Sequence, residues 1–163
     1  MPPMLKVPFA PECYVTDFPS SLTSPKVGCQ GCQSSPALDF TFAFAYQPIV
    51  DLRDRSVFAH EALVRGTNGE GALSILSQVN EQNRYRFDQR CRTQAIQGAA
   101  QLGMKENLSI NFMPSAVYRP ELCIRSTLEA AKEHDFPLNR LIFETLESDH
   151  LDNNRHLTNI LRE

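Results

Sequence analysis

The chain has 163 residues, of which 42% are hydrophobic and 21% charged, with a formal net charge of -3. This length and composition predict one soluble globular domain with a buried core, and leave room for a tail. Because Lys and Arg do not gather into a basic run, binding of nucleic acid through phosphate neutralisation is not expected.

The chain shows no sign of a membrane anchor or a disulfide framework. No segment reaches the roughly 18 consecutive apolar residues of a membrane helix, and MPPMLKVPFAPE at the N-terminus lacks a basic stretch followed by an apolar one. We therefore expect no membrane association and a cytoplasmic location. Five cysteines, an odd number at irregular spacing, favour reduced thiols.

Residues 1–38 are predicted to form an irregular arm, and residues 39–163 the folded domain. The arm holds seven of the eleven prolines and shows no apolar periodicity. It contains Cys13 and the pair Cys29 and Cys32 in GCQGC. Such a CxxC pair can begin a zinc site, although a structural site usually needs four ligands and no His precedes His60. Free or redox-sensitive thiols are the alternative.

Two strands and two helices are expected over residues 40–103. FTFAFAYQPIV (40–50) alternates aromatic and small residues and should stop at Pro48, and DLRDR turns the chain into a neighbouring strand at SVFAHEALVRG (56–66). A helix should begin in GEGALSILSQV (69–79). A second, amphipathic helix over residues 86–103 should end at Gly103, and its apolar positions are Phe87, Cys91, Ala95, Ala99 and Leu102.

The same alternation is predicted for the rest of the chain. NLSINF (107–112) should be a strand, and residues 114–137 should carry a helix whose apolar positions are Leu122, Ile124, Leu128 and Ala131. RLIFETLESD (140–149) should begin with a strand, and a last helix is expected in 152–163. Strands alternating with helices are typical of an α/β fold with a parallel sheet.

Other polar and thiol positions have structural interpretations. The stretch NRYRFDQRCR (83–92), with four arginines and Asp88, is interpreted as a solvated helix face with local ion pairs. Cys91 and Cys123 are expected to be core thiols. His60, next to Glu61 on a strand, should point to the opposite face of the sheet.

Three oxygen-bearing side chains occupy successive strand segments: Glu61, Asn111 and Glu144. The ends of parallel neighbouring strands lie about 5 Å apart, so these side chains can converge at one face of the sheet. Two carboxylates and an amide carbonyl are hard oxygen donors, suited to Mg²⁺ or Mn²⁺ rather than zinc. The alternative is that each serves only a local turn or surface ion pair, and that Arg65 is an ordinary surface charge.

Four motifs resemble one family. HEALVRG, preceded by YQPIVDL and followed by SINFMPSAV and LIFETLESD, is similar to the EAL-domain family of bacterial cyclic di-GMP phosphodiesterases, from about Phe40 to the last residue. The resemblance implies a modified (β/α)8 TIM-like barrel. It also implies hydrolysis of one phosphodiester of cyclic di-GMP to linear pGpG, with two Mg²⁺ or Mn²⁺ ions.

Matching the motifs residue by residue assigns roles. Glu61, Asn111 and Glu144 would be metal ligands, and the two carboxylates catalytic residues; Gln47 and Arg65 would contact the substrate, and Glu147 would support a neighbouring loop. Arg65 suits a phosphate oxygen because a guanidinium offers paired donors. Leu146 stands where the family commonly has Thr, which is a minor departure.

A larger departure concerns motifs that the family carries after these. The sequence contains no Asp-Asp dipeptide, although family members use an Asp-Asp-Phe-Gly strand and a later Lys. The chain is also shorter than the ~250 residues of a full barrel. We therefore expect the N-terminal part of the barrel, truncated, with an exposed sheet edge open to a homo-oligomer or protein partner and no hydrolysis by this chain alone.

Three hypotheses follow from this resemblance. The chain is the front part of an ordinary hydrolase, or a degenerate EAL domain that binds a protein partner, or a sensor that binds cyclic di-GMP without the metal site. Retention of Glu61, Asn111 and Glu144 favours the first.

Overall fold

The computed structural model describes residues 36–117, 119–145 and 158. In chain order its elements are β1 (Ala43–Asp51), β2 (Ser56–Arg65), α2 (Ala72–Leu76), α3 (Arg84–Gln101), β3 (Asn107–Asn111), α4 (Pro120–Cys123), α5 (Arg125–Glu133) and β4 (Leu141–Glu144). Short 3-10 helices occupy Pro114–Ala116 and Leu138–Arg140. Residues 1–35 of the predicted arm (1–38) and, apart from Thr158, the last predicted helix (152–163) lie outside the described residues.

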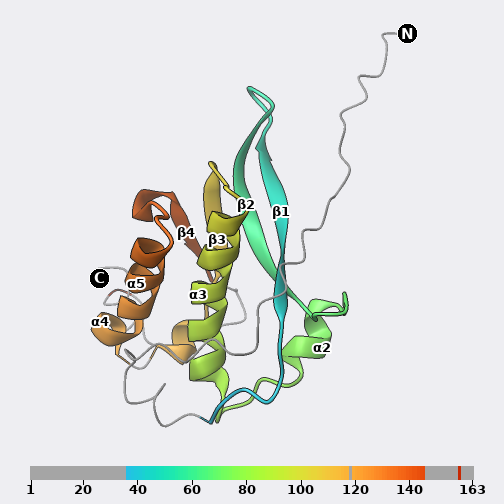
Figure 1. Cartoon of the computed structure of the whole chain (residues 1–163), viewed down its shortest axis with the longest axis vertical. Helices are drawn as coiled ribbons and strands as arrows, with labels where there is room; N and C mark the ends of the chain where they lie inside the picture. The colour runs from blue at the N-terminus through green and yellow to red at the C-terminus, as the bar shows by residue number, and fades with distance from the viewer. Residues whose placement is uncertain (1–35, 118, 146–157, 159–163) are drawn as a thin grey trace.

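The four described strands form one open sheet in the order β1-β2-β3-β4 (Figure 1). β1 and β2 are an antiparallel hairpin, whereas β2, β3 and β4 run parallel. The predicted strand pair and the parallel arrangement are confirmed. The predicted stop at Pro48 is wrong, because β1 continues through it to Asp51. An edge strand tolerates the missing N–H of proline, since only one side of that strand pairs with a neighbour.

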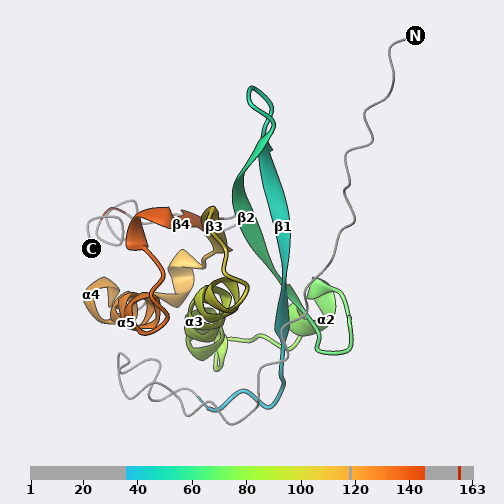
Figure 2. The ribbon, with the colours of Figure 1, turned by 45° about the horizontal axis from the view of Figure 1, so that its top comes forward.

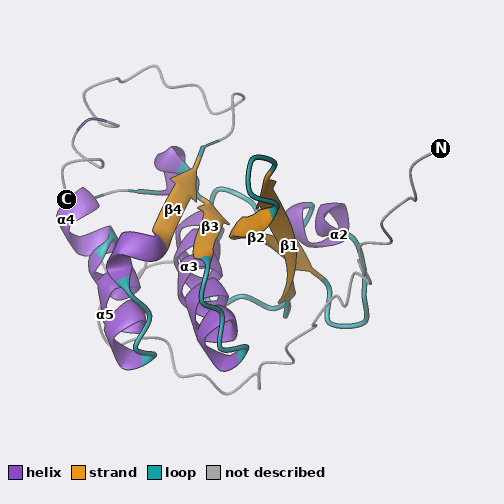
Figure 3. Ribbon diagram, turned by 90° about the horizontal axis from the view of Figure 1, so that it is seen from above, coloured by secondary structure: helices purple, strands orange, loops and turns teal. Residues whose placement is uncertain are grey.

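Helices α3 and α5 cover one face of this sheet (Figures 2 and 3). Side chains of this face join the main hydrophobic core, where Leu108 and Ile110 of β3 pack with Ala95 and Ile96 of α3. The Tyr46 hydroxyl on β1 donates a hydrogen bond to the Ala95 carbonyl oxygen at 2.8 Å. Helix α2 contacts β2 and lies beside β1, at the opposite end of the sheet from α5 (Figure 3).

The amphipathic helix α3 follows the predicted pattern. Phe87, Cys91, Ala95 and Ala99 are buried as expected, but Leu102 is partly exposed, because it follows the last residue of the helix. Gly103 adopts a positive φ of 65° and its N–H donates to the Ala100 carbonyl. This left-handed residue ends the helix where the sequence predicted it.

The helix expected over 114–137 is divided into shorter pieces. α4 ends at Cys123, α5 begins at Arg125, and Leu128 is 41% exposed instead of buried. The residues of α5 that are buried are Ser126, Thr127, Ala130 and Ala131. α5 packs against α3 (Figure 2), and small side chains allow two helices to approach closely. The larger Leu128 therefore lies outside this contact.

Charge on α3 is not distributed as predicted. The side chains of Asp88 and Arg92 are each only 1% exposed and form an ion pair at 3.0 Å, one helical turn apart. The expectation of a solvated face was therefore wrong for these two residues. Arg92 is buried because its side of α3 faces Cys123 and Thr127.

The described part of the chain contains no helix with both the length and the apolar character needed to cross a bilayer.

Cys91 and Cys123 are buried core thiols, as predicted. Burial raises the pKa of the Cys91 thiol well above its usual value, and the nearby Asp88 carboxylate raises that pKa further. Because the thiolate is the reactive form, we expect Cys91 to resist iodoacetamide at pH 8 in the folded protein and to react after unfolding in urea. Peptide mass spectrometry measures this. Labelling of Cys91 at equal rates with and without urea would contradict it.

Candidate functional site

Glu61 and Asn111 meet on the face of the sheet that faces away from α3. Glu61 lies within β2, Asn111 is the last residue of β3, and both side chains are half-buried. The Asn111 amide nitrogen Nδ2 donates a hydrogen bond to Glu61 Oε1 at 2.8 Å. Two residues that are 50 positions apart in sequence are thus in direct contact, as expected for residues on neighbouring parallel strands.

Glu144 lies beside them at the end of β4. Register pairs Glu144 with Asn111, so the two side chains share a face of the sheet. Glu144 Oε1 accepts a hydrogen bond from the hydroxyl of Ser109, a fully buried residue that pairs with Glu61 across β2 and β3. Sequence reasoning missed Ser109. Its signal was its position two residues before Asn111, which puts it on the same face of a strand.

Gln47 and Arg65 extend this polar face. Gln47 on β1 pairs with Glu61, and its side chain is exposed. Arg65 follows Glu61 by four residues on β2 and so points to the same side, where its Nη1 donates to the Val64 carbonyl oxygen at 2.8 Å. Within the described residues neither side chain hydrogen-bonds to Glu61, Asn111 or Glu144, so both are placed on the face without joining the cluster.

The loop after Arg65 is closed by Glu70. Gly66 N–H donates to the Glu70 carbonyl oxygen, and the Glu70 carboxylate accepts from the Asn68 backbone N–H at 2.9 Å and from its side-chain amide at 3.1 Å. The backbone N–H of Glu70 itself, followed by the two Asn68 donors, lowers the pKa of the Glu70 carboxyl. A Cβ on Gly66 would lie 2.0 Å from Glu70 Oε2 and 2.8 Å from Glu70 Cβ. The loop thus requires glycine at this position.

We expect Gly66→Ala to reduce the free energy of unfolding by about 1–3 kcal/mol, the usual cost of overpacking. Combining it with Glu70→Ala should recover part of this loss, because the clash with the Glu70 carboxylate is then absent and only the contact with the Cβ at position 70 is left. Urea unfolding of the two single variants and the double variant measures the coupling. Strictly additive losses would contradict the steric explanation.

Other predicted positions lie elsewhere. His60 points to the opposite face from Glu61, as expected, and its Nδ1 lies 3.9 Å from the Glu106 carboxylate. Glu147, Cys13, Cys29 and Cys32 lie outside the described residues, so their roles remain predictions.

The donor set of the cluster suits a hard divalent cation. Glu61 and Glu144 supply carboxylate oxygens, and Ser109 and Asn111 supply neutral oxygens; Mg²⁺ is commonly held by one or two carboxylates while it keeps several waters. Among the described residues, no group of three or more His, Cys, Asp or Glu gathers that could hold a metal ion. The donors of Asn111 and Ser109 currently face the carboxylates. Asn111 must therefore turn its carbonyl oxygen inward to bind a cation.

A model of the EAL domain family matches residues 35–163. The chain belongs to the EAL domain family. This is a family of cyclic di-GMP phosphodiesterases, and the match includes every residue of the polar cluster. The family assignment made from the four sequence motifs is confirmed.

Solved EAL structures resemble this EAL domain over part of their length. A standalone versatile EAL protein from Vibrio cholerae O395, in a c-di-GMP bound form, is 52% identical, with a TM-score of 0.73 over 77% of this chain and 53% of that chain. The present chain thus spans about half the length of that relative. No curated protein matches the sequence.

More distant EAL structures share the fold. Klebsiella pneumoniae BlrP1, in a manganese and cyclic diGMP complex at pH 6, is 24% identical, with a TM-score of 0.67 over 74% of this chain and 31% of that chain. The EAL domain of Xanthomonas citri FimX, in complex with c-diGMP, is 21% identical, with a TM-score of 0.58 over 73% of this chain and 47% of that chain. At this identity the likeness indicates the fold alone.

Proposed function

We propose that this EAL domain binds cyclic di-GMP on the polar face of its sheet, and that Glu61, Asn111 and Glu144 hold a divalent cation there for phosphodiester hydrolysis to pGpG. The contact between Asn111 and Glu61 at 2.8 Å carries the proposal, because it joins two motif residues on neighbouring parallel strands. The c-di-GMP bound form of the 52% identical Vibrio relative supports the choice of ligand.

The wider fold is part of the same proposal. We infer that β2, β3 and β4 are parallel strands of a modified (β/α)8 barrel. The polar face would then line the barrel interior, and α3 and α5 would belong to its outer layer. The partial overlap with the Vibrio structure supports this reading. Binding of a second copy or a protein partner along the sheet edge remains a prediction.

The residues of the face have complementary tasks. A bound Mg²⁺ or Mn²⁺ would neutralise phosphoryl oxygens and lower the pKa of a bound water. Glu61 and Glu144 provide the negative charge that holds the cation. Arg65 can offer paired N–H donors to a phosphate once it leaves the Val64 carbonyl oxygen. Gln47 pairs with Glu61 from β1, and in this proposal it would orient the substrate from the neighbouring strand.

Hydrolysis by these 163 residues alone is expected to be below detection. The sequence carries no Asp-Asp dipeptide, and the resemblance places an Asp-Asp-Phe-Gly motif among the metal ligands of active members. Incubation with cyclic di-GMP and Mn²⁺, followed by chromatography, tests this. We expect no pGpG, and its release would show that the residues present are sufficient.

A cyclic di-GMP sensor without a metal is the second candidate. One observation favours it: Asn111 and Ser109 already donate hydrogen bonds to the two carboxylates, so the cluster is satisfied without a cation. Calorimetric titration of cyclic di-GMP in EDTA and in Mn²⁺ distinguishes the two functions. Equal affinities favour the sensor, whereas tighter binding in Mn²⁺ favours the catalytic site.

Arg65→Lys is expected to weaken cyclic di-GMP binding about tenfold, because Lys keeps the charge but loses the paired donors of the guanidinium. Calorimetry measures the change. Arg53→Lys is the matched control, since Arg53 lies on the exposed turn between β1 and β2 and pairs with Asp51. Equal affinities of the two variants would contradict a phosphate contact by Arg65.

A further inference from the structure

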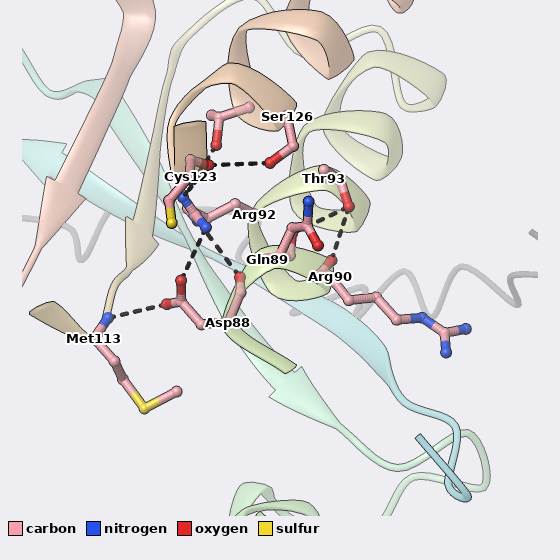
Figure 4. A network of polar contacts seen from close by, with 9 residues as sticks. Asp88, Gln89, Arg90, Arg92, Thr93, Met113, Cys123 and Ser126 are labelled. Carbon is pink, nitrogen blue, oxygen red and sulfur yellow. Dashed lines mark hydrogen bonds and ion pairs between the residues drawn. The ribbon is translucent and has the colours of Figure 1, made fainter. Parts of the chain in front are cut away.

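A buried ion pair lies on α3, below the end of β3 (Figure 4). Arg92 Nη2 lies 3.0 Å from Asp88 Oδ2, and both side chains are 1% exposed. Removing two charges from water is costly, and apolar residues often replace such pairs without loss of stability. Stability alone therefore does not account for this ion pair, and the other contacts of Asp88 and Arg92 indicate its role.

Asp88 holds the backbone that leaves β3. Its Oδ1 accepts a hydrogen bond from the Met113 backbone N–H at 3.0 Å (Figure 4). Met113 is the second residue after Asn111, the last residue of β3. Between them, Phe112 N–H donates to the Glu144 carbonyl oxygen at 2.9 Å. The exit from β3 is thus fixed on one side by β4 and on the other by Asp88.

Arg92 connects the same point to the neighbouring helices. Its Nη1 donates to the Cys123 carbonyl oxygen at 3.4 Å and to Thr127 Oγ1 at 3.3 Å. Its guanidinium also lies 6.0 Å from the centre of the Phe112 ring. Arg92 therefore holds the Asp88 carboxylate in place while it joins α3 to α4, α5 and the exit of β3.

We infer that Asp88 is a positioning residue for the Asn111 side chain, and that Arg92 serves to balance the buried Asp88 charge. Asp88 fixes the backbone at Met113, and this sets the direction in which Asn111 at the strand end presents its amide to Glu61. The role of Asn111 toward a cation rests on the proposed function, whereas its contact with Glu61 does not. Both residues lie on α3, which covers the other face of the sheet (Figure 3).

Two double variants separate positioning from folding. Asp88→Leu/Arg92→Met removes both charges and the acceptor for Met113 N–H. Asp88→Asn/Arg92→Met removes both charges but keeps an oxygen acceptor. Thermal unfolding identifies a temperature at which both variants are folded. At that temperature, the NMR resonances of the Asn111 side-chain amide and the Mn²⁺ affinity from calorimetric titration of the full chain are measured for each variant and compared with those of the wild type.

We expect the Leu variant to shift the Asn111 amide resonances toward those of a free amide and to weaken Mn²⁺ binding roughly tenfold to a hundredfold, as loss of an outer support typically does. The Asn variant should keep wild-type resonances and affinity. Identical behaviour of the two folded variants, whether both match the wild type or both differ from it, would overturn the inference. If the wild type does not bind Mn²⁺, the metal role proposed for Asn111 fails, and the amide resonances alone decide positioning.

Discussion

Arg92→Met alone is expected to lower the free energy of unfolding by about 3–5 kcal/mol, because it leaves the Asp88 carboxylate buried without its cation. Asp88 is 1% exposed and its Oδ2 lies 3.0 Å from Arg92 Nη2, so water cannot replace the lost partner without opening the contact between α3 and α5. Urea unfolding measures the change.

A second variant and a control identify the cause. Adding Asp88→Asn to Arg92→Met removes the buried carboxylate charge and should recover most of the loss. Arg90→Met is the matched control on the same helix. Arg90 is half-buried and lies 5.7 Å from the centre of the Phe42 ring, a contact worth about 0.5–1 kcal/mol. If Arg92→Met costs no more than Arg90→Met, the ion pair does not have the importance given to it.

Glu61→Gln should weaken Mn²⁺ binding roughly a hundredfold, because it removes one of two carboxylate charges from the proposed site. The amide oxygen of Gln has the same position as Glu61 Oε1 and can still accept from Asn111 Nδ2. The free energy of unfolding should therefore stay within about 0.5 kcal/mol of the wild type. Calorimetry and urea unfolding of the same sample measure both quantities.

The control for Glu61→Gln is Glu106→Gln, which removes one carboxylate near His60, a residue that points to the opposite face. This control should leave Mn²⁺ affinity unchanged. Similar weakening by both substitutions would indicate that net charge, and not the Glu61 site, governs cation binding.

The polar face was predictable because its signals are local. Each of three apolar strand segments carries a single carboxylate or amide, and this pattern predicted that Glu61, Asn111 and Glu144 can converge on one face. The structure brings Asn111 to Glu61 and places Glu144 beside them. Ser109 carried the same period-two signal and was missed because a lone serine in a strand is common.

The support beneath this face was not predictable from local pattern. Asp88 and Arg92 are one turn apart in a charged stretch, which usually indicates a solvated helix face. Their burial depends on the Met113 N–H and on the Cys123 carbonyl oxygen, two backbone groups of distant segments. Backbone groups are present at almost every residue, so sequence does not reveal which of them a side chain will meet.

Edge position and helix contacts explain two further errors. Pro48 lies inside β1 because β1 is the outer strand of the described sheet, and strand order is not visible in the residues around a proline. Leu128 is exposed because α5 meets α3 through small residues. Both outcomes were decided by tertiary packing.

Calorimetric titration of cyclic di-GMP into the 163-residue chain in the presence of Mn²⁺ tests the central claim most directly. The proposed function predicts saturable binding of one ligand per chain, weakened by Arg65→Lys and by Glu61→Gln but unaffected by Arg53→Lys. No binding by a wild-type sample whose circular dichroism shows it to be folded would contradict the claim that this face of the EAL domain is a cyclic di-GMP site.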